Sequence, residues 1–145
     1  MNGTSAALEQ IARLKTLLGE AGNIDSDVLV CPPATLLERA SQRAQGSALR
    51  IGGQDCHANP SGAHTGDVSA SMLLDAGASH VIVGHSERRA DHGETSETVR
   101  AKAAAALAAG LVPIICVGET EAERLAGTAN QVVGEQVKFS LPETL

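Results

Sequence analysis

The stretch His80-Val81-Ile82-Val83-Gly84 most clearly indicates the fold of this chain. Its apolar residues follow one another without polar alternation, which is typical of a strand buried on both faces of a parallel sheet. Similar apolar runs cover residues 27–31 and 111–117, and a run weakened by glycines covers residues 49–54. We therefore expect four buried strands.

Helical patterns separate these strands. Apolar residues recur at helical spacing after Thr4 or Ser5, either of which can cap a helix start, and Gly22 suits the position after its end. Capping boxes, in which a threonine pairs with a glutamate or glutamine three residues later, begin at Thr120 and Thr128. We expect helices over residues 5–22, 33–45, 69–76, 95–109, 120–126 and 128–139, and a helical turn after residue 85. Strands alternating with helices indicate an α/β fold with a parallel sheet covered by helices, and periodicity alone leaves open whether the sheet is doubly wound or a closed barrel.

The composition bounds the function. The 145 residues suit one domain, have a net charge of −6 and contain no basic run, which argues against nucleic acid and membranes as partners. Phe139 is the only aromatic residue, so stacking platforms for bases or sugars are excluded. The three cysteines lack CxxC spacing, and the sequence shows no secretory signal, so we expect reduced thiols in a cytosolic protein.

His85 is the outstanding candidate for a functional residue. In parallel α/β folds, functional groups gather beyond the C-terminal ends of strands, and His85 directly follows such an end. It also opens a helical turn, where the helix dipole favours a neutral imidazole that can polarise a carbonyl group. A histidine bonded to a nearby carboxylate is the alternative. Glu87 and Glu119 can serve as general acid or base, with salt bridges to nearby arginines as the alternative.

The long loop between the second and third strands contains residue types that bind metals. These residues are Asp55, Cys56, His57 and His64. Their spacing matches no zinc pattern, so we predict no metal site. The glycines lack the contexts of nucleotide-binding loops. We expect His80 to be structural and His92 to be solvated.

Residues 81–89, which read Val-Ile-Val-Gly-His-Ser-Glu-Arg-Arg, resemble the catalytic-histidine segment of the triosephosphate isomerase family. Further resemblances to that family, in the family's order, cover residues 1–3, 51–56, 62–67 and 114–120. The resemblance implies a (β/α)8 barrel, of which residues 1–145 would form one incomplete domain with about four parallel strands and their helices. It also implies a cytoplasmic, homodimeric isomerase of glycolysis and gluconeogenesis. Such an enzyme interconverts dihydroxyacetone phosphate and glyceraldehyde 3-phosphate without a cofactor.

The resemblance also assigns roles to residues. His85 would be the electrophile, and Glu87 would support it. A neutral histidine is an established feature of this family, so that property of His85 is not an independent result. The residues that would lie at the dimer interface are His64, Thr65, Gly66 and Arg88, with Thr65 approaching the partner's active site.

The family's remaining catalytic groups are expected outside these residues. Its catalytic lysine precedes the segment that residues 1–3 resemble, and its catalytic glutamate, mobile lid and phosphate loops follow the region that ends at Leu145. We expect no substitute for the lysine from Lys15, Lys102 or Lys138, and none for the glutamate from Glu87 or Glu119. The 145-residue chain alone is therefore predicted to be inactive.

Two other functions compete with this one. The first is an inactive barrel fragment that self-associates, because a partial barrel exposes the apolar layer that would fill its interior. For that fragment we expect Val83 and Ile115 to be buried only against a second copy. The second is a flavodoxin-like binding module, which would need a phosphate-binding loop that the sequence does not show.

Overall fold

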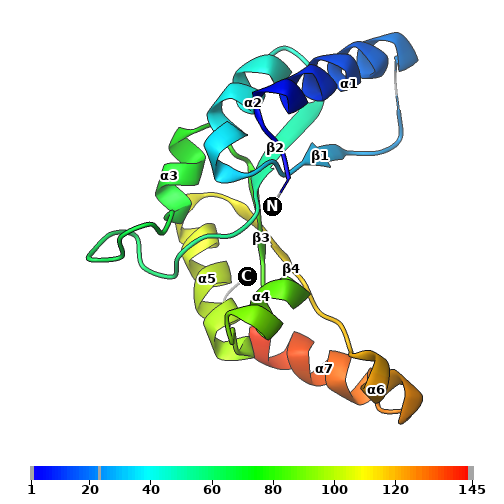
Figure 1. Cartoon of the computed structure of the whole chain (residues 1–145), viewed down its shortest axis with the longest axis vertical. Helices are drawn as coiled ribbons and strands as arrows, with labels where there is room; N and C mark the ends of the chain where they lie inside the picture. Colours follow the sequence, from blue (N-terminus) through cyan, green and yellow to red (C-terminus); the bar gives the residue numbers. More distant parts are fainter. Residues whose placement is uncertain (1, 23, 144–145) are drawn as a thin grey trace.

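The computed structural model describes residues 2–22 and 24–143 and shows an α/β fold with a single four-stranded sheet (Figure 1). Its strands are β1 (Val28–Val30), β2 (Leu49–Gly53), β3 (His80–Val83) and β4 (Val112–Ile115). They are all parallel and lie side by side in chain order. The predicted parallel sheet is thus confirmed. Met1 and Leu145, which the sequence comparison used, lie outside the described residues.

Helices connect and follow the strands as expected. They are α1 (Leu8–Ala21), α2 (Leu37–Ala44), α3 (Ala70–Asp75), α4 (Ser86–Asp91), α5 (Ser96–Ala109), α6 (Glu121–Leu125) and α7 (Ala129–Ser140). Short 3-10 turns at Ser5–Ala7 and Ala34–Leu36 precede α1 and α2. The predicted boundaries are therefore correct to within a few residues, apart from these tighter first turns.

The helix caps agree with the sequence at some ends and differ at others. The capping box of Thr120 and Glu123 is present at the start of α6. The box predicted at Thr128 is wrong, because its hydroxyl donates to the carbonyl of Glu123, 3.1 Å away, and leaves α7 without a side-chain cap. Neither Thr4 nor Ser5 caps α1, since the 3-10 turn separates them from that helix.

Helices cover only one face of the sheet. In Figure 1 they follow the outer side of the curved strands, and the opposite side of β3 and β4 is open. Val81 and Val83 point toward the helices and are fully buried, whereas Val112 and Ile114 on the other face are 53% and 37% exposed. The expectation that the strands are buried on both faces is therefore wrong within the described residues. The expectation that Val83 and Ile115 are buried only against a second copy is also wrong: a single chain buries Val83 completely, and Ile115 packs, partly buried, against the same core.

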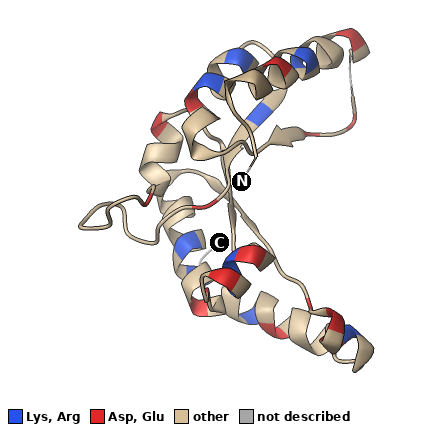
Figure 2. Cartoon of the chain, viewed as in Figure 1, with Lys and Arg blue, Asp and Glu red and all other residues tan. Residues whose placement is uncertain are grey.

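Charged residues are spread over the helices, with lysines and arginines interspersed among acidic residues (Figure 2). None of the helices in the described part of the chain combines the length and the apolar character that crossing a bilayer requires. The hydrophobic core joins the covered face of the sheet to the inner faces of α1, α2, α3 and α5. This core fixes the ends of β2 and β3, from which the candidate site is built.

Candidate active site

His85 lies directly after β3 and forms the N-cap of α4. Gly84 makes the turn into the helix with a φ of +69°, a conformation that glycine adopts without strain. The Nδ1 atom of His85 accepts a hydrogen bond from the backbone N–H of Glu87, at 3.3 Å. Because Nδ1 accepts, the proton of a neutral ring is assigned to Nε2, which is left as a donor.

Glu87 is close to His85 but largely exposed. Its Oε2 atom lies 3.7 Å from Nδ1 of His85, and its side chain is 79% exposed. A carboxylate therefore lies beside the imidazole, as the alternative interpretation of His85 expects. The His85 side chain is itself 45% exposed, so it remains accessible to a small molecule.

A cavity of about 520 Å³ opens beside His85, a volume within the range of small-molecule sites. The residues that line it are Gln54, Asp55, Ile82, His85, Glu87, Arg88, Asp91 and His92. They come from the C-terminal ends of β2 and β3 and from α4. His92, expected to be solvated, is exposed and lines this cavity. His80, expected to be structural, pairs through Nδ1 with the hydroxyl of Ser79 at 2.8 Å.

A charged network fixes one wall of this cavity. Arg88 Nε lies 2.9 Å from Asp55 Oδ2 and 2.5 Å from Glu94 Oε1. Lys102 Nζ lies 2.7 Å from Asp55 Oδ2 and 2.6 Å from Glu94 Oε1. Lys102 and Glu94 are buried, so their charges are compensated mainly inside the protein. The network joins the loop after β2 to α4 and α5. Among the described residues Arg88 pairs with Asp55 and Glu94 and not with Glu87, so the salt-bridge alternative for Glu87 is not confirmed.

The two carboxylates of the network respond differently to burial. Burial raises the pKa of Asp55, and the opposing effect of Lys102 and Arg88 does not cancel it. Burial also acts to raise the pKa of Glu94, but hydrogen bonds from Lys102 and Arg88 outweigh it and lower that pKa. The second oxygen of Glu94, Oε2, is buried with no hydrogen-bond partner among the described residues. Both cations thus concentrate on the other oxygen, Oε1.

Sequence reasoning missed this network. Glu94 follows a short turn after α4, and neither its position nor its neighbours distinguish it from a surface residue. Lys102 offered a weak signal, because it lies on an alanine-rich helix at a position that faces the core. Only the three-dimensional structure brings these two residues to Asp55 and Arg88.

Glu119 does not line the His85 cavity. Its carboxylate pairs with the guanidinium of Arg124 on α6. A backbone hydrogen bond and the Arg124 contact lower the pKa of Glu119, so it is held ionised. The salt-bridge interpretation for Glu119 is therefore confirmed.

The predicted interface residues divide between two places. His64, Thr65 and Gly66 lie in the loop between β2 and α3, which projects away from the helices (Figure 1). Thr65 is exposed there. Arg88 belongs to the charged network. Together with Gly66 it also lines a second cavity, of about 400 Å³. The structure thus brings Gly66 and Arg88 to one cavity, which Thr65 does not line.

The candidate metal ligands are also divided. Asp55 belongs to the charged network, while His57, His64 and Asp67 offer ligand atoms within 4.8 Å of one another. The rings of His57 and His64 stack with centroids 3.9 Å apart and planes 30° apart. Both rings already bond to Asn59: Nδ1 of His57 accepts from its backbone N–H at 2.9 Å, and Nε2 of His64 pairs with its Nδ2 at 3.0 Å. The arrangement suits a brace within the loop better than a metal centre.

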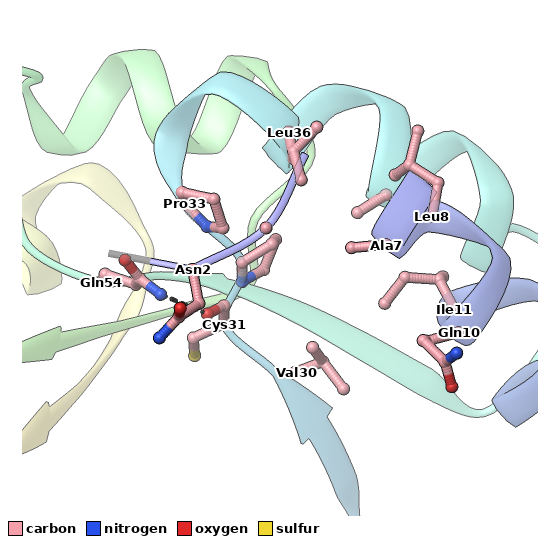
Figure 3. A pocket seen from close by; sticks show the side chains of 13 residues that line it. Asn2, Ala7, Leu8, Gln10, Ile11, Val30, Cys31, Pro33, Leu36 and Gln54 are labelled. Carbon is pink, nitrogen blue, oxygen red and sulfur yellow. Dashed lines mark hydrogen bonds between the residues drawn. The ribbon is translucent and has the colours of Figure 1, made fainter. Parts of the chain in front are cut away.

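A third cavity, of about 250 Å³, lies at the end of β1 and is mainly apolar (Figure 3). Gln54 crosses its edge, where its side-chain amide donates to the carbonyl of Cys31 at 2.9 Å. This bond ties the ends of β1 and β2 together. No acidic residue or histidine lines this cavity, so the chemistry of the site remains with His85.

None of the three lysines lies beside His85, where its ammonium group could act as a cationic catalyst. Lys102 is held in the charged network. Lys15 donates to the carbonyl of Gln45 at the end of α2. Lys138 lies 5.2 Å from the ring centroid of Phe139 on α7. The cavity of His85 is lined by none of them.

Comparison with known proteins decides the family. A family model for triosephosphate isomerase matches residues 1–144. The chain belongs to the triosephosphate isomerase family. It is 60% identical to the triosephosphate isomerase of Ruegeria pomeroyi and 59% identical to that of Afipia carboxidovorans, in both cases over 143 residues and 99% of this chain.

The structural comparison agrees with this membership. A crystal structure of triosephosphate isomerase from Bartonella henselae superimposes with a TM-score of 0.92 at 45% sequence identity, and the match covers all of this chain. The fold is thus that of part of a triosephosphate isomerase barrel. The chain spans 56% and 57% of the lengths of the two curated relatives and 59% of the Bartonella chain.

Proposed function

We propose that this chain is part of a triosephosphate isomerase, which interconverts dihydroxyacetone phosphate and glyceraldehyde 3-phosphate by proton transfer. His85 is its electrophile. The observation that supports this role is the hydrogen bond from the Glu87 N–H to Nδ1, which leaves Nε2–H as the donor. When a base removes the proton next to the substrate carbonyl, negative charge develops on the carbonyl oxygen, and a fixed donor stabilises it.

Glu87 has a supporting role in this proposal. Its carboxylate lies 3.7 Å from the Nδ1 side of the imidazole, away from the proposed donor atom. Glu87 acts through its backbone N–H, which donates to Nδ1 of His85 and so favours the form of the ring with a proton on Nε2. The cavity beside both residues receives the triose phosphate, and no cofactor takes part in the proposed reaction.

In this proposal the described residues supply the electrophile, Glu87 only supports it, and the general base and the catalytic lysine are not among them. A general base alone contributes a factor of about 10²–10⁴ to such reactions. We expect no measurable isomerisation by the 145-residue chain in a coupled assay. Turnover by the rigorously purified chain at a rate typical of its relatives would contradict this division of the catalytic groups.

The role of His85 is tested in the full-length enzyme that contains this sequence. His85→Gln is expected to lower kcat by about 10²-fold or more, because it removes the positioned imidazole donor. His92→Gln is the matched control, since His92 lines the same cavity but lies at the C-terminal end of α4, not at its N-cap. Equal losses of activity and thermal stability in His85→Gln would favour a structural role instead.

We also propose that the protein is a cytoplasmic homo-oligomer, with a self-associating fragment as the alternative function for the chain alone. Three free cysteines fit a reducing compartment. The exposed side chains of Val112 and Ile114 favour burial against a second copy. Ultracentrifugation of the 145-residue chain at micromolar concentration should show dimers or larger species. A stable monomer would remove self-association from the proposal.

In that assembly, the projecting loop with His64, Thr65 and Gly66 is the proposed contact with the partner, together with Arg88. Thr65→Arg should weaken the association of the full-length enzyme, because it adds bulk and charge at an exposed position of this loop. Unchanged association would exclude Thr65 from the interface.

A further inference from the structure

Two adjacent arginines on α4 make entirely different contacts. Arg88 bonds to carboxylates, whereas Arg89 bonds only to neutral oxygens. The acceptors of Arg89 are the carbonyls of Gly84, at 2.9 Å, and Cys116, at 3.1 Å, and the hydroxyls of Ser96, at 3.2 Å, and Ser140, at 3.1 Å. All three guanidinium nitrogens are used. Among the described residues, Arg89 forms no salt bridge within 4.0 Å.

The four acceptors lie at the ends of four different elements. Gly84 and Cys116 directly follow β3 and β4, Ser96 begins α5, and Ser140 ends α7. Ser140 is fully buried, although it lies at the end of a helix. A planar guanidinium with five N–H donors can hold several acceptors in a fixed arrangement, which a lysine ammonium cannot reproduce. Arg89 therefore fixes the relative positions of these four ends.

The contact with Gly84 reaches the candidate site directly. Gly84 precedes His85, and its backbone is enclosed by neighbours. A Cβ added to Gly84 would lie 2.7 Å from both methyl carbons of Val99 and 3.1 Å from Nη2 of Arg89. The Gly84 carbonyl accepts from Nε of Arg89, so the peptide that joins Gly84 to His85 is held by packing and by a hydrogen bond.

We propose that Arg89 is the positioning residue of His85, an inference that rests on the proposed function. By fixing the Gly84–His85 peptide, Arg89 aims the imidazole so that Nδ1 meets the N–H of Glu87 and Nε2–H faces the cavity. It does not touch the substrate. Its positive charge has no acidic partner in the part of the chain that the structure describes, and its hydrogen-bonding geometry is what the site requires.

Nuclear magnetic resonance on the 145-residue chain tests this role without substrate. Two readouts report on His85: the ¹⁵N signals of its ring, assigned with His85→Gln, and the hydrogen exchange of the Glu87 amide. In Arg89→Lys, we expect the ring to change from the single Nε2–H tautomer to a mixture. The Glu87 amide should exchange about two- to tenfold faster than in the unsubstituted chain, as the loss of one hydrogen bond implies.

Arg39→Lys is the matched control. Arg39 on α2 also donates only to neutral oxygens, the hydroxyl of Ser5 at 2.9 Å and the carbonyl of Thr35 at 3.1 Å, but does not contact His85. It should leave both readouts unchanged. If Arg89→Lys does not fold, Ser140→Ala removes one acceptor of the guanidinium and should produce a smaller change in the same direction.

The outcomes separate this proposal from the proposed function. If Arg89→Lys speeds exchange equally at all amides and leaves the His85 tautomer unchanged, Arg89 is only structural and the proposal is overturned. That result would leave the role of His85 itself in place. Conversely, a full-length enzyme without isomerase activity would contradict the proposed function, while a tautomer change in Arg89→Lys would still support positioning.

Discussion

The central strands β2 and β3 and the outer strands β1 and β4 are all predominantly apolar in sequence, yet the structure treats them differently. Val81 and Val83 on β3 are completely buried, whereas Val112 and Ile114 on β4 are 53% and 37% exposed. The loop after β2 and the helix after β3 share a charged network, while the one ion pair in the described segment after β4 joins Glu119 to the exposed Arg124. Position in the sheet, and not the apolar character of a strand, thus decides which strand end is rigid enough to build a site.

The largest difference between the two regions should come from their ion pairs. Lys102→Met leaves the buried carboxylate of Glu94 and the partly buried one of Asp55 with one cation and should lower the free energy of unfolding by about 3–5 kcal/mol. Arg124→Met removes an exposed pair and should cost less than about 1 kcal/mol. Urea unfolding of both variants measures the contrast. Equal losses would show that the network is no more stabilising than a surface pair.

Glycines next to the strand ends should show the next largest difference. Gly84→Ala places a Cβ against Val99 in a backbone of positive φ and should cost about 2–4 kcal/mol. Gly118 after β4 has open space around it, so Gly118→Ala should change stability by less than about 0.5 kcal/mol. Thermal unfolding followed by circular dichroism compares them. If Gly84→Ala were as stable as the unsubstituted chain, packing would not fix the turn before His85.

A third comparison concerns the effect on stability of shortening a valine on the central strand β3 and one on the outer strand β4. Val83→Ala should destabilise the chain by about 2 kcal/mol, because it leaves a small cavity in a fully buried site. Val112→Ala should cost less than about 0.5 kcal/mol in a monomer, since Val112 is half exposed. A larger loss at Val112 that grows with protein concentration would instead reveal burial against a second copy.

The smallest effect concerns thiol chemistry, which leaves stability unchanged. Burial raises the pKa of Cys56 to about 11, and burial also raises the pKa values of the half-buried Cys31 and Cys116. The thiolate is the reactive form, so all three should react slowly with iodoacetamide at pH 8. Peptide mass spectrometry should find Cys31 and Cys116, after the outer strands, alkylated before Cys56. Labelling of all three at one rate would place the buried and outer thiols in equivalent environments.

The sequence predicted much of the architecture because its signals are local. Apolar runs located the four strands, and the Thr120 capping box located α6. The position of His85 after β3 also followed from local order, and its catalytic role stays a prediction. The face to which each residue points did not follow, because an uninterrupted apolar run has no alternation to distinguish Val83 from Ile82. The false box at Thr128 shows the same limit, since its hydroxyl prefers a carbonyl in the preceding helix.

The charged network lay beyond sequence reasoning for a different reason. Asp55, Glu94 and Lys102 are separated by up to 47 residues, and no local pattern links a carboxylate to a lysine at that separation. Their contact depends on the angle between α4 and α5 and on the path of the loop after β2. Arg89 has the same property, since its acceptor on Ser140 is 51 residues away.

The order β1-β2-β3-β4 of the sheet means that each strand pairs with the strand made just before it. On the ribosome, where the N-terminal part of a chain emerges first, a new strand–helix unit can therefore dock on an edge that already exists. Contacts between neighbouring units keep sequence separations modest, which favours rapid folding. The hydrogen bonds of Arg89 are an exception, because Ser140 must be synthesised before the last of them can close. The full set of hydrogen bonds around Arg89 can thus close only after α7 has been synthesised.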